Sequence, residues 1–121
     1  MAGFASLVVL DLECAHPPAL AEFYHQVLGW DVSVGHDDYV EITDGSTRIL
    51  FTRREGYEGP GWPEAGGPKR YHLGMRTADM IAGVKRCVDL GASKPGFKPG
   101  GDRWTVLLDP SGHPFCLAQA E

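Results

Sequence analysis

Residues 20–30 read LAEFYHQVLGW and carry the pattern of a short amphipathic helix with its end. Apolar side chains recur there at the offsets of one helical face. Pro17 and Pro18 stand just before this run, where proline suits the first turn of a helix. Gly29 follows the run, where a glycine commonly ends a helix. We therefore predict a helix from the prolines to Leu28.

Strand patterns surround this helix. Residues 6–13 (SLVVLDLE) begin with β-branched apolar residues and then alternate, as a strand does. Residues 31–34 and 39–43 predict two short strands after the helix. Asp44-Gly45 is a hairpin signal, and residues 48–52 form the expected returning strand.

The chain then repeats this order. Residues 71–76 predict a strand, Asp79 can cap a helix that starts at Met80, and Leu90-Gly91 ends that helix as Leu28-Gly29 ends the first. Residues 104–108 and 115–119 flank Asp109-Pro110-Ser111-Gly112, which suits a type I turn. The segment 53–69 between the two runs is rich in glycine and proline, and loops of this length are usually functional or mobile. We expect one domain, 1–121, made of half-units at about 1–66 and 67–121.

Composition narrows the class of protein. The chain has 121 residues, 43% of them hydrophobic and 22% charged, as in an ordinary single globular domain. A net charge of -5 and basic residues that occur only in pairs argue against nucleic-acid binding. Charged residues interrupt every apolar run, so we expect no membrane span. Three cysteines without CxxC spacing and an N-terminus without a basic leader favour reduced thiols in the cytoplasm.

The repeat and its motifs resemble the vicinal-oxygen-chelate superfamily, in particular its glyoxalase-like and bleomycin-resistance members. LAEFY followed by VLGW, residues 20–30, is similar to the family's first helix and its exit, and LDPSGHPF, residues 108–115, to its last hairpin. Tyr71-His72-Leu73 matches the opening of the second unit. This resemblance covers nearly the whole chain. It implies an α+β fold of paired βαβββ units that form a curved mixed sheet around a cleft, and a homodimer.

The resemblance also allows a test for a metal centre. Metal-dependent members place His, Glu or Gln ligands at four points, which fall here near Leu7, at Leu50 or Phe51, at His72 and at Cys116. Only His72 is a retained ligand, and zinc or iron sites need three or four converging donors. We therefore expect no metal or other cofactor, although a divalent metal bound through His72 stays open as an alternative.

Several residues are candidates for a site. His72 can serve as a hydrogen-bond donor or a general base, or can be a histidine left from a metal-binding ancestor. Asp11 and Arg76 share the ligand-bearing faces of their strands, so they either pair with each other or contact a polar ligand, and Asp11 is a second catalytic candidate. The candidate ligand-binding residues are Trp62, Tyr57, Trp104, Phe51, Arg76 and Cys116, of which the aromatic ones offer flat surfaces for stacking. Cys116 can also be a small buried apolar residue.

Two main hypotheses about function remain. One is a metal-free protein that binds a small molecule, aromatic or not, in resistance or metabolism. The other is a lyase, isomerase or dioxygenase that uses His72. A vestigial cleft in an interaction module is a third, because a fold does not determine function.

Overall fold

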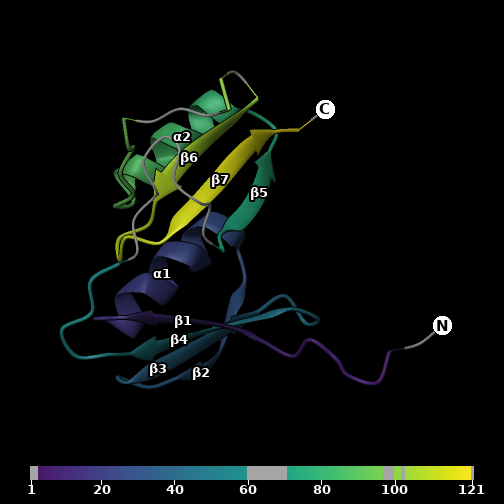
Figure 1. Cartoon of the computed structure of the whole chain (residues 1–121), viewed down its shortest axis with the longest axis vertical. Coiled ribbons are helices and arrows are strands. Elements are labelled where there is room, and N and C mark those ends of the chain that lie inside the picture. Colours follow the sequence, from purple (N-terminus) through teal and green to yellow (C-terminus); the bar gives the residue numbers. More distant parts are fainter. Residues whose placement is uncertain (1–2, 60–70, 97–99, 102, 121) are drawn as a thin grey trace. The chain divides into compact units, whose positions relative to one another are not determined.

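The computed structural model of the chain describes residues 3–59, 71–96, 100–101 and 103–120 (Figure 1). It divides into two compact units, Met1–Tyr57 and Glu58–Glu121. The division lies within the glycine- and proline-rich segment that the sequence marks as the seam. Each unit holds one mixed sheet and one helix, which confirms the predicted α+β class.

Unit 1 has the predicted βαβββ order. Its elements are β1 (Leu10–Cys14), α1 (Pro17–Leu28), β2 (Asp31–Gly35), β3 (Tyr39–Thr43) and β4 (Arg48–Arg53). The sheet order is β1-β4-β3-β2, with β1 parallel to β4 and the other pairs antiparallel. Gly29 ends α1 in the left-handed conformation at φ 74°, as its position after the apolar run predicts.

The core of unit 1 lies between α1 and one face of this sheet. Tyr24 of α1 is fully buried and stacks on Phe51 of β4, with ring centroids 5.6 Å apart and planes 10° from parallel. Ile42 and Ile49, paired across β3 and β4, complete this face. Because side chains alternate along a strand, Asp11, Leu50 and Thr52 lie on the opposite face.

The first strand begins at Leu10, later than the predicted start at Ser6. Its partner explains the difference, because β4 begins at Arg48 and Leu10 already pairs with Ile49. Leu7 and Val8 precede that pairing and are 96% and 63% exposed. A strand pattern without a neighbouring strand to bond to forms no ladder.

Unit 2 consists of β5 (Leu73–Thr77), α2 (Met80–Asp89), β6 (Trp104–Leu108) and β7 (Pro114–Gln119), in the sheet order β5-β7-β6. The carboxylate of Asp79 accepts a hydrogen bond from the Ala82 N–H at 3.1 Å, so the predicted cap is confirmed. Within the described part of the unit the sheet has one strand fewer than in unit 1. Ser93, which follows α2, forms an isolated bridge to Leu108 instead.

The β6–β7 turn is built around a buried carboxylate. Asp109 is 3% exposed, and its Oδ1 accepts hydrogen bonds from the Ser111 N–H at 2.8 Å and the His113 N–H at 3.0 Å. The Gly112 N–H also donates to the Asp109 carbonyl at 2.8 Å, and Gly112 has φ 88°. The predicted turn is thus confirmed, and its acidic first residue holds the chain reversal.

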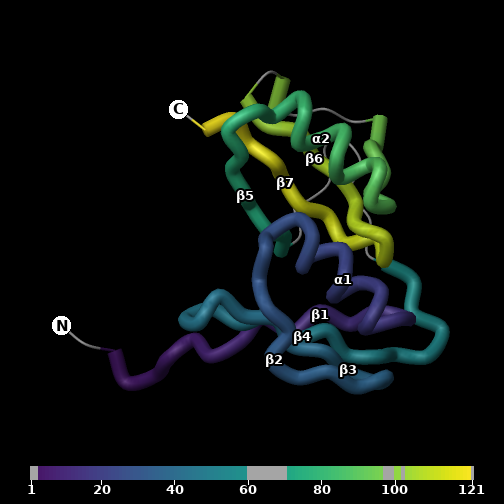
Figure 2. Tube along the Cα trace, turned by 180° about the vertical axis from the view of Figure 1, so that it is seen from behind, coloured from purple at the N-terminus to yellow at the C-terminus, as the bar shows by residue number. Residues whose placement is uncertain are grey.

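In Figure 2, each helix lies against the sheet of its own unit. In unit 2, α2 covers the face that carries Leu117 and Thr77, since a Cβ on Gly83 would meet these two side chains at 3.0 and 3.1 Å. Cys87 is buried on the sheet side of α2, and this burial raises the pKa of its thiol. The three cysteines, all within the described residues, form no disulfide. No described helix has the length and apolar character to cross a membrane.

Candidate functional site

One face of the unit 2 sheet is turned away from α2, and we call it the helix-free face. Strand register defines it: Gly74, Cys116 and Val106 pair side by side, and Arg76, Ala118 and Trp104 form the neighbouring row. His72 directly precedes β5, two residues before Gly74. Three of the predicted site residues therefore share this face, Arg76, Trp104 and Cys116, and His72 would join them if the alternation of β5 continued one residue before the strand.

The middle of the helix-free face is low, because Gly74 and Ala118 have little or no side chain. Arg76 and Trp104 stand on either side of Ala118, two strand spacings or about 10 Å apart. Arg76 and His72 are exposed, whereas Trp104 and Cys116 are half-buried. A flat ligand on this floor would have an indole at one side and a guanidinium at the other.

The indole of Trp104 has its own support. A Cβ on the buried Gly100 would overlap the indole ring, so glycine there leaves room for the ring. The Arg103 guanidinium carbon lies 5.9 Å from the ring centroid, within the range of a cation–π contact. These neighbours restrict the indole at the end of β6.

The unit 1 candidates are distributed differently. Asp11 lies on the face opposite α1, and its Oδ1 accepts a hydrogen bond from the Thr52 hydroxyl at 2.8 Å. This gives Asp11 a partner within its own sheet. Asp11 and Arg76 belong to different units, and their ion pair stays a prediction.

The three other aromatic candidates have separate settings. Phe51 lies on the α1 side, fully buried against Tyr24, which is a core position. Tyr57 is half-buried shortly after β4, and its N–H donates to the Arg54 carbonyl at 3.2 Å. Trp62 lies outside the described residues. The placement of Phe51 thus favours packing over ligand contact.

The donor set does not fit a divalent metal. Of the four positions that the family resemblance assigns to ligands, Leu7 and Leu50 or Phe51 have no donor atom, and only His72 and Cys116 could coordinate. Among the described residues, no group of three or more His, Cys, Asp or Glu side chains could hold an ion. Two donors are fewer than zinc or iron requires.

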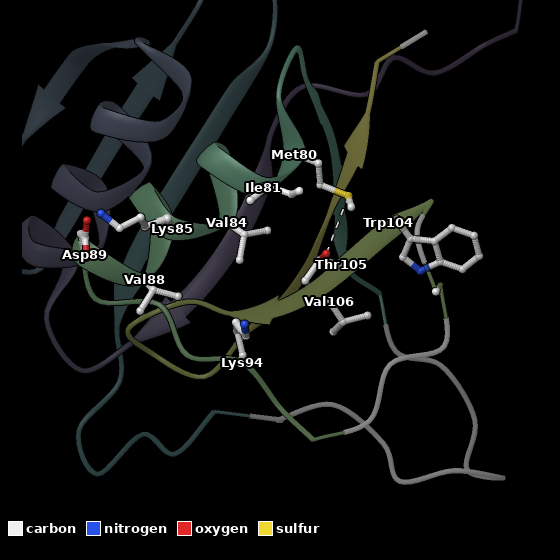
Figure 3. A pocket seen from close by; sticks show the side chains of 11 residues that line it. Met80, Ile81, Val84, Lys85, Val88, Asp89, Lys94, Trp104, Thr105 and Val106 are labelled. Carbon is white, nitrogen blue, oxygen red and sulfur yellow. Dashed lines mark hydrogen bonds between the residues drawn. The ribbon is translucent and has the colours of Figure 1, made fainter.

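A pocket that the sequence did not predict lies within unit 2, between α2 and β6 (Figure 3). Its volume is about 660 Å³. Three kinds of side chain line it: the apolar Met80, Ile81, Val84 and Val88 of α2, the charged Lys85, Asp89 and Lys94, and residues Trp104, Thr105 and Val106 of β6, with Gly101 completing the lining. The sequence signal that could have indicated this pocket is Ile81, an apolar residue beside the core-facing stripe of α2. In the structure Ile81 is 83% exposed.

Comparisons with known proteins agree on the family and fold. The model of the glyoxalase-like domain matches residues 7–118. A glyoxalase/bleomycin resistance protein/dioxygenase family enzyme from Burkholderia phytofirmans superimposes with a TM-score of 0.72 at 20% identity, covering 97% of this chain and all of the other. A glyoxalase-related enzyme from Fulvimarina pelagi gives 0.68 at 16% identity, over 97% and 89% of the two chains.

A third similar structure is a bleomycin-binding protein from Streptomyces verticillus in complex with copper(II)-bleomycin. It superimposes with a TM-score of 0.59 at 18% identity over the full length of both chains. Comparison with curated protein sequences gives no significant match. At these identities the structural similarities establish the fold alone.

Proposed function

The chain belongs to the glyoxalase-like domain family, and from this premise we propose that it binds a small molecule without the help of a metal ion. The observation that carries the proposal is the helix-free face of unit 2. It gathers Arg76, Trp104 and Cys116 around a floor of small residues, with His72 just before the start of β5. Binding sites of this kind combine apolar surface with a few convergent polar groups.

The chemistry of this face favours a flat ligand with a negative or strongly polar group. The indole of Trp104 can stack on a planar ring, which contributes affinity without any reaction. The exposed guanidinium of Arg76 can donate paired hydrogen bonds to a carboxylate. We therefore propose an aromatic acid or a comparable planar drug or metabolite as the ligand.

Two further considerations support binding over metal chemistry. The assigned ligand positions offer only His72 and Cys116 as donors. The S. verticillus protein of the same fold is described as binding bleomycin, so this architecture is compatible with the sequestration of a small molecule. A role in drug resistance or in metabolite binding follows as part of the same proposal.

An enzymatic role is the second candidate, because His72 is retained at a ligand position and is exposed directly before β5. It would act there as a general base or as a single metal ligand. A homodimer and a cytoplasmic location are also proposals. Light scattering on the purified protein tests the homodimer.

The deciding experiment has two parts. Metal content is measured on tag-free protein, before and after dialysis against Mn, Fe, Co, Ni and Zn, for wild type, His72→Ala and the control His36→Ala. We expect no stoichiometric metal in any of them. A tight metal lost only in His72→Ala would overturn the proposal in favour of the enzyme.

The second part is a calorimetric titration of a panel of aromatic carboxylates, drugs and neutral analogues. We expect micromolar binding of at least one aromatic acid, weakened by Arg76→Gln and by Trp104→Leu. The control is Arg86→Gln, which removes an exposed charge from the last turn of α2. Equal affinities in Arg76→Gln and Arg86→Gln would exclude the helix-free face as the binding site.

A further inference from the structure

The pocket between α2 and β6 lies entirely within unit 2, at the β6 edge of its sheet. Arg76 and Cys116 lie on β5 and β7 and do not line it. Thr105, which lines the pocket, pairs with Leu117 and shares the helix-covered face with it. Its hydroxyl donates to the Met80 sulfur at 3.7 Å, which ties β6 to the beginning of α2. The pocket adjoins the helix-free face at Trp104 and Val106, which line both, whereas Arg76, His72 and Cys116 do not line the pocket.

The size of the pocket suits a small organic molecule. Its volume of about 660 Å³ falls inside the range of about 300–1,000 Å³ usual for ligand sites. The α2 wall runs from Met80 to Val88, and at 1.5 Å per residue it is about 12 Å long. An extended chain of several carbons fits along such a wall.

The wall is apolar and accessible. Figure 3 shows Ile81, Val84 and Val88 following one another along α2, with Trp104 at the β6 end. Ile81 is 83% exposed and Val88 41% exposed, so apolar area on this side of α2 is left in contact with water. Covering that area with an apolar ligand is favourable by the hydrophobic effect.

The charged residues of the lining favour a ligand with a negative charge. Lys85 and Asp89 are neighbours one helical turn apart, a spacing at which opposite charges compensate each other. Lys94 enters from the segment after α2 and is the remaining lining charge. The lining thus has a net charge of +1, which complements a single negative group.

We propose that the α2–β6 pocket is a second ligand site, which takes an amphiphilic carboxylate such as a medium-chain fatty acid. The apolar chain lies along Ile81, Val84 and Val88. The carboxylate lies toward Lys94, where the ammonium group can donate to it.

Calorimetric titration with decanoate and decanol tests the proposal, since the two share the chain and differ in the charged group. We expect decanoate to bind with micromolar affinity and decanol more weakly. The variant Ile81→Asp should weaken decanoate binding at least tenfold, because it puts a negative charge on the exposed wall. Ala82→Asp adds the same charge at an exposed residue of α2 outside the pocket lining and should leave the affinity unchanged.

Two further variants sharpen the result. Lys94→Gln should reduce the preference for decanoate over decanol by about fivefold, the upper range for an exposed ion pair. Arg76→Gln should have no effect, because Arg76 lies on the helix-free face and does not line the pocket. Absence of decanoate binding, equal binding of decanol and decanoate in the wild type, or equal affinities in Ile81→Asp and Ala82→Asp would overturn the proposal.

Discussion

Replacement of Asp109 by alanine removes the acceptor that holds the β6–β7 turn. In the native structure its Oδ1 accepts from the backbone N–H groups of Ser111 and His113, at 2.8 and 3.0 Å. A hydrogen bond to a charged group contributes about 1.5–3 kcal/mol. Ser111 and His113 are only half-buried, so water can reach the turn after the substitution and each loss falls near the lower limit. The free energy of unfolding should therefore decrease by about 3 kcal/mol in Asp109→Ala.

Urea unfolding at pH 7, followed by tryptophan fluorescence and far-UV circular dichroism, measures this change. For a chain of this length the expected loss corresponds to a decrease in Tm of about 10 °C. Asp109→Asn is the matched control, because it keeps an oxygen acceptor without the charge and should lose about half as much. A free energy of unfolding for Asp109→Ala within about 0.5 kcal/mol of wild type, the range of ordinary surface changes, would refute the reasoning. Asparagine as damaging as alanine would show that the acceptor is not what stabilises the turn.

Three more changes test the core, a helix cap and a thiol. Phe51→Ala should lower the free energy of unfolding by about 3–5 kcal/mol, because its fully buried ring stacks on Tyr24. Denaturant unfolding measures this change, and a near-neutral result would return Phe51 to the ligand-binding candidates. Asp79→Ala should cost about 1 kcal/mol through the lost hydrogen bond from the Ala82 N–H, while Asp79→Asn should be nearly neutral; thermal unfolding of the two variants distinguishes capping from a general charge effect. The Cys87 thiol should react with iodoacetamide more slowly than in the unfolded chain, as peptide mapping would show, because burial raises its pKa. The pKa of the Cys87 thiol is higher in the folded than in the unfolded state, so its contribution to stability is complete below the ordinary thiol pKa and is lost as pH rises through the folded value. In that alkaline range the wild type should therefore lose more stability than Cys87→Ala.

Elements whose limits depend on local chemistry were predictable from the sequence. Gly29 ends α1 with a left-handed residue, and Asp79 caps α2 through its own side chain. Asp44 turns the chain between β3 and β4 by accepting from the N–H groups of Thr47 and Ser46, which also lowers the pKa of its carboxyl group. Each of these signals lies within a few residues of the feature it produces.

Features that depend on distant partners were harder to predict. The start of β1 is set by where β4 begins, which the residues from Ser6 onward do not encode. Leu50 and Phe51 are adjacent and both apolar, and only the position of α1 determines which of them is core. The shared face of Arg76 and Cys116 could be predicted, because side chains alternate along a strand with a period of two. The α2–β6 pocket could not be predicted, because it depends on where β6 lies relative to the side of α2 that carries Ile81.

The two helices differ in how firmly their side chains hold them to their sheets. Five residues of α1 are buried, among them Tyr24 with its stacked partner, whereas Cys87 is the single buried residue of α2. Backbone amides exchange their hydrogens through openings whose free energy rises with the buried contacts that must be broken. Amides of α1 should therefore exchange only in rare, extensive openings, and those of α2 in frequent local ones. We therefore expect a kinetically rigid half and a compliant half, in which α2 adjusts without unfolding of the rest.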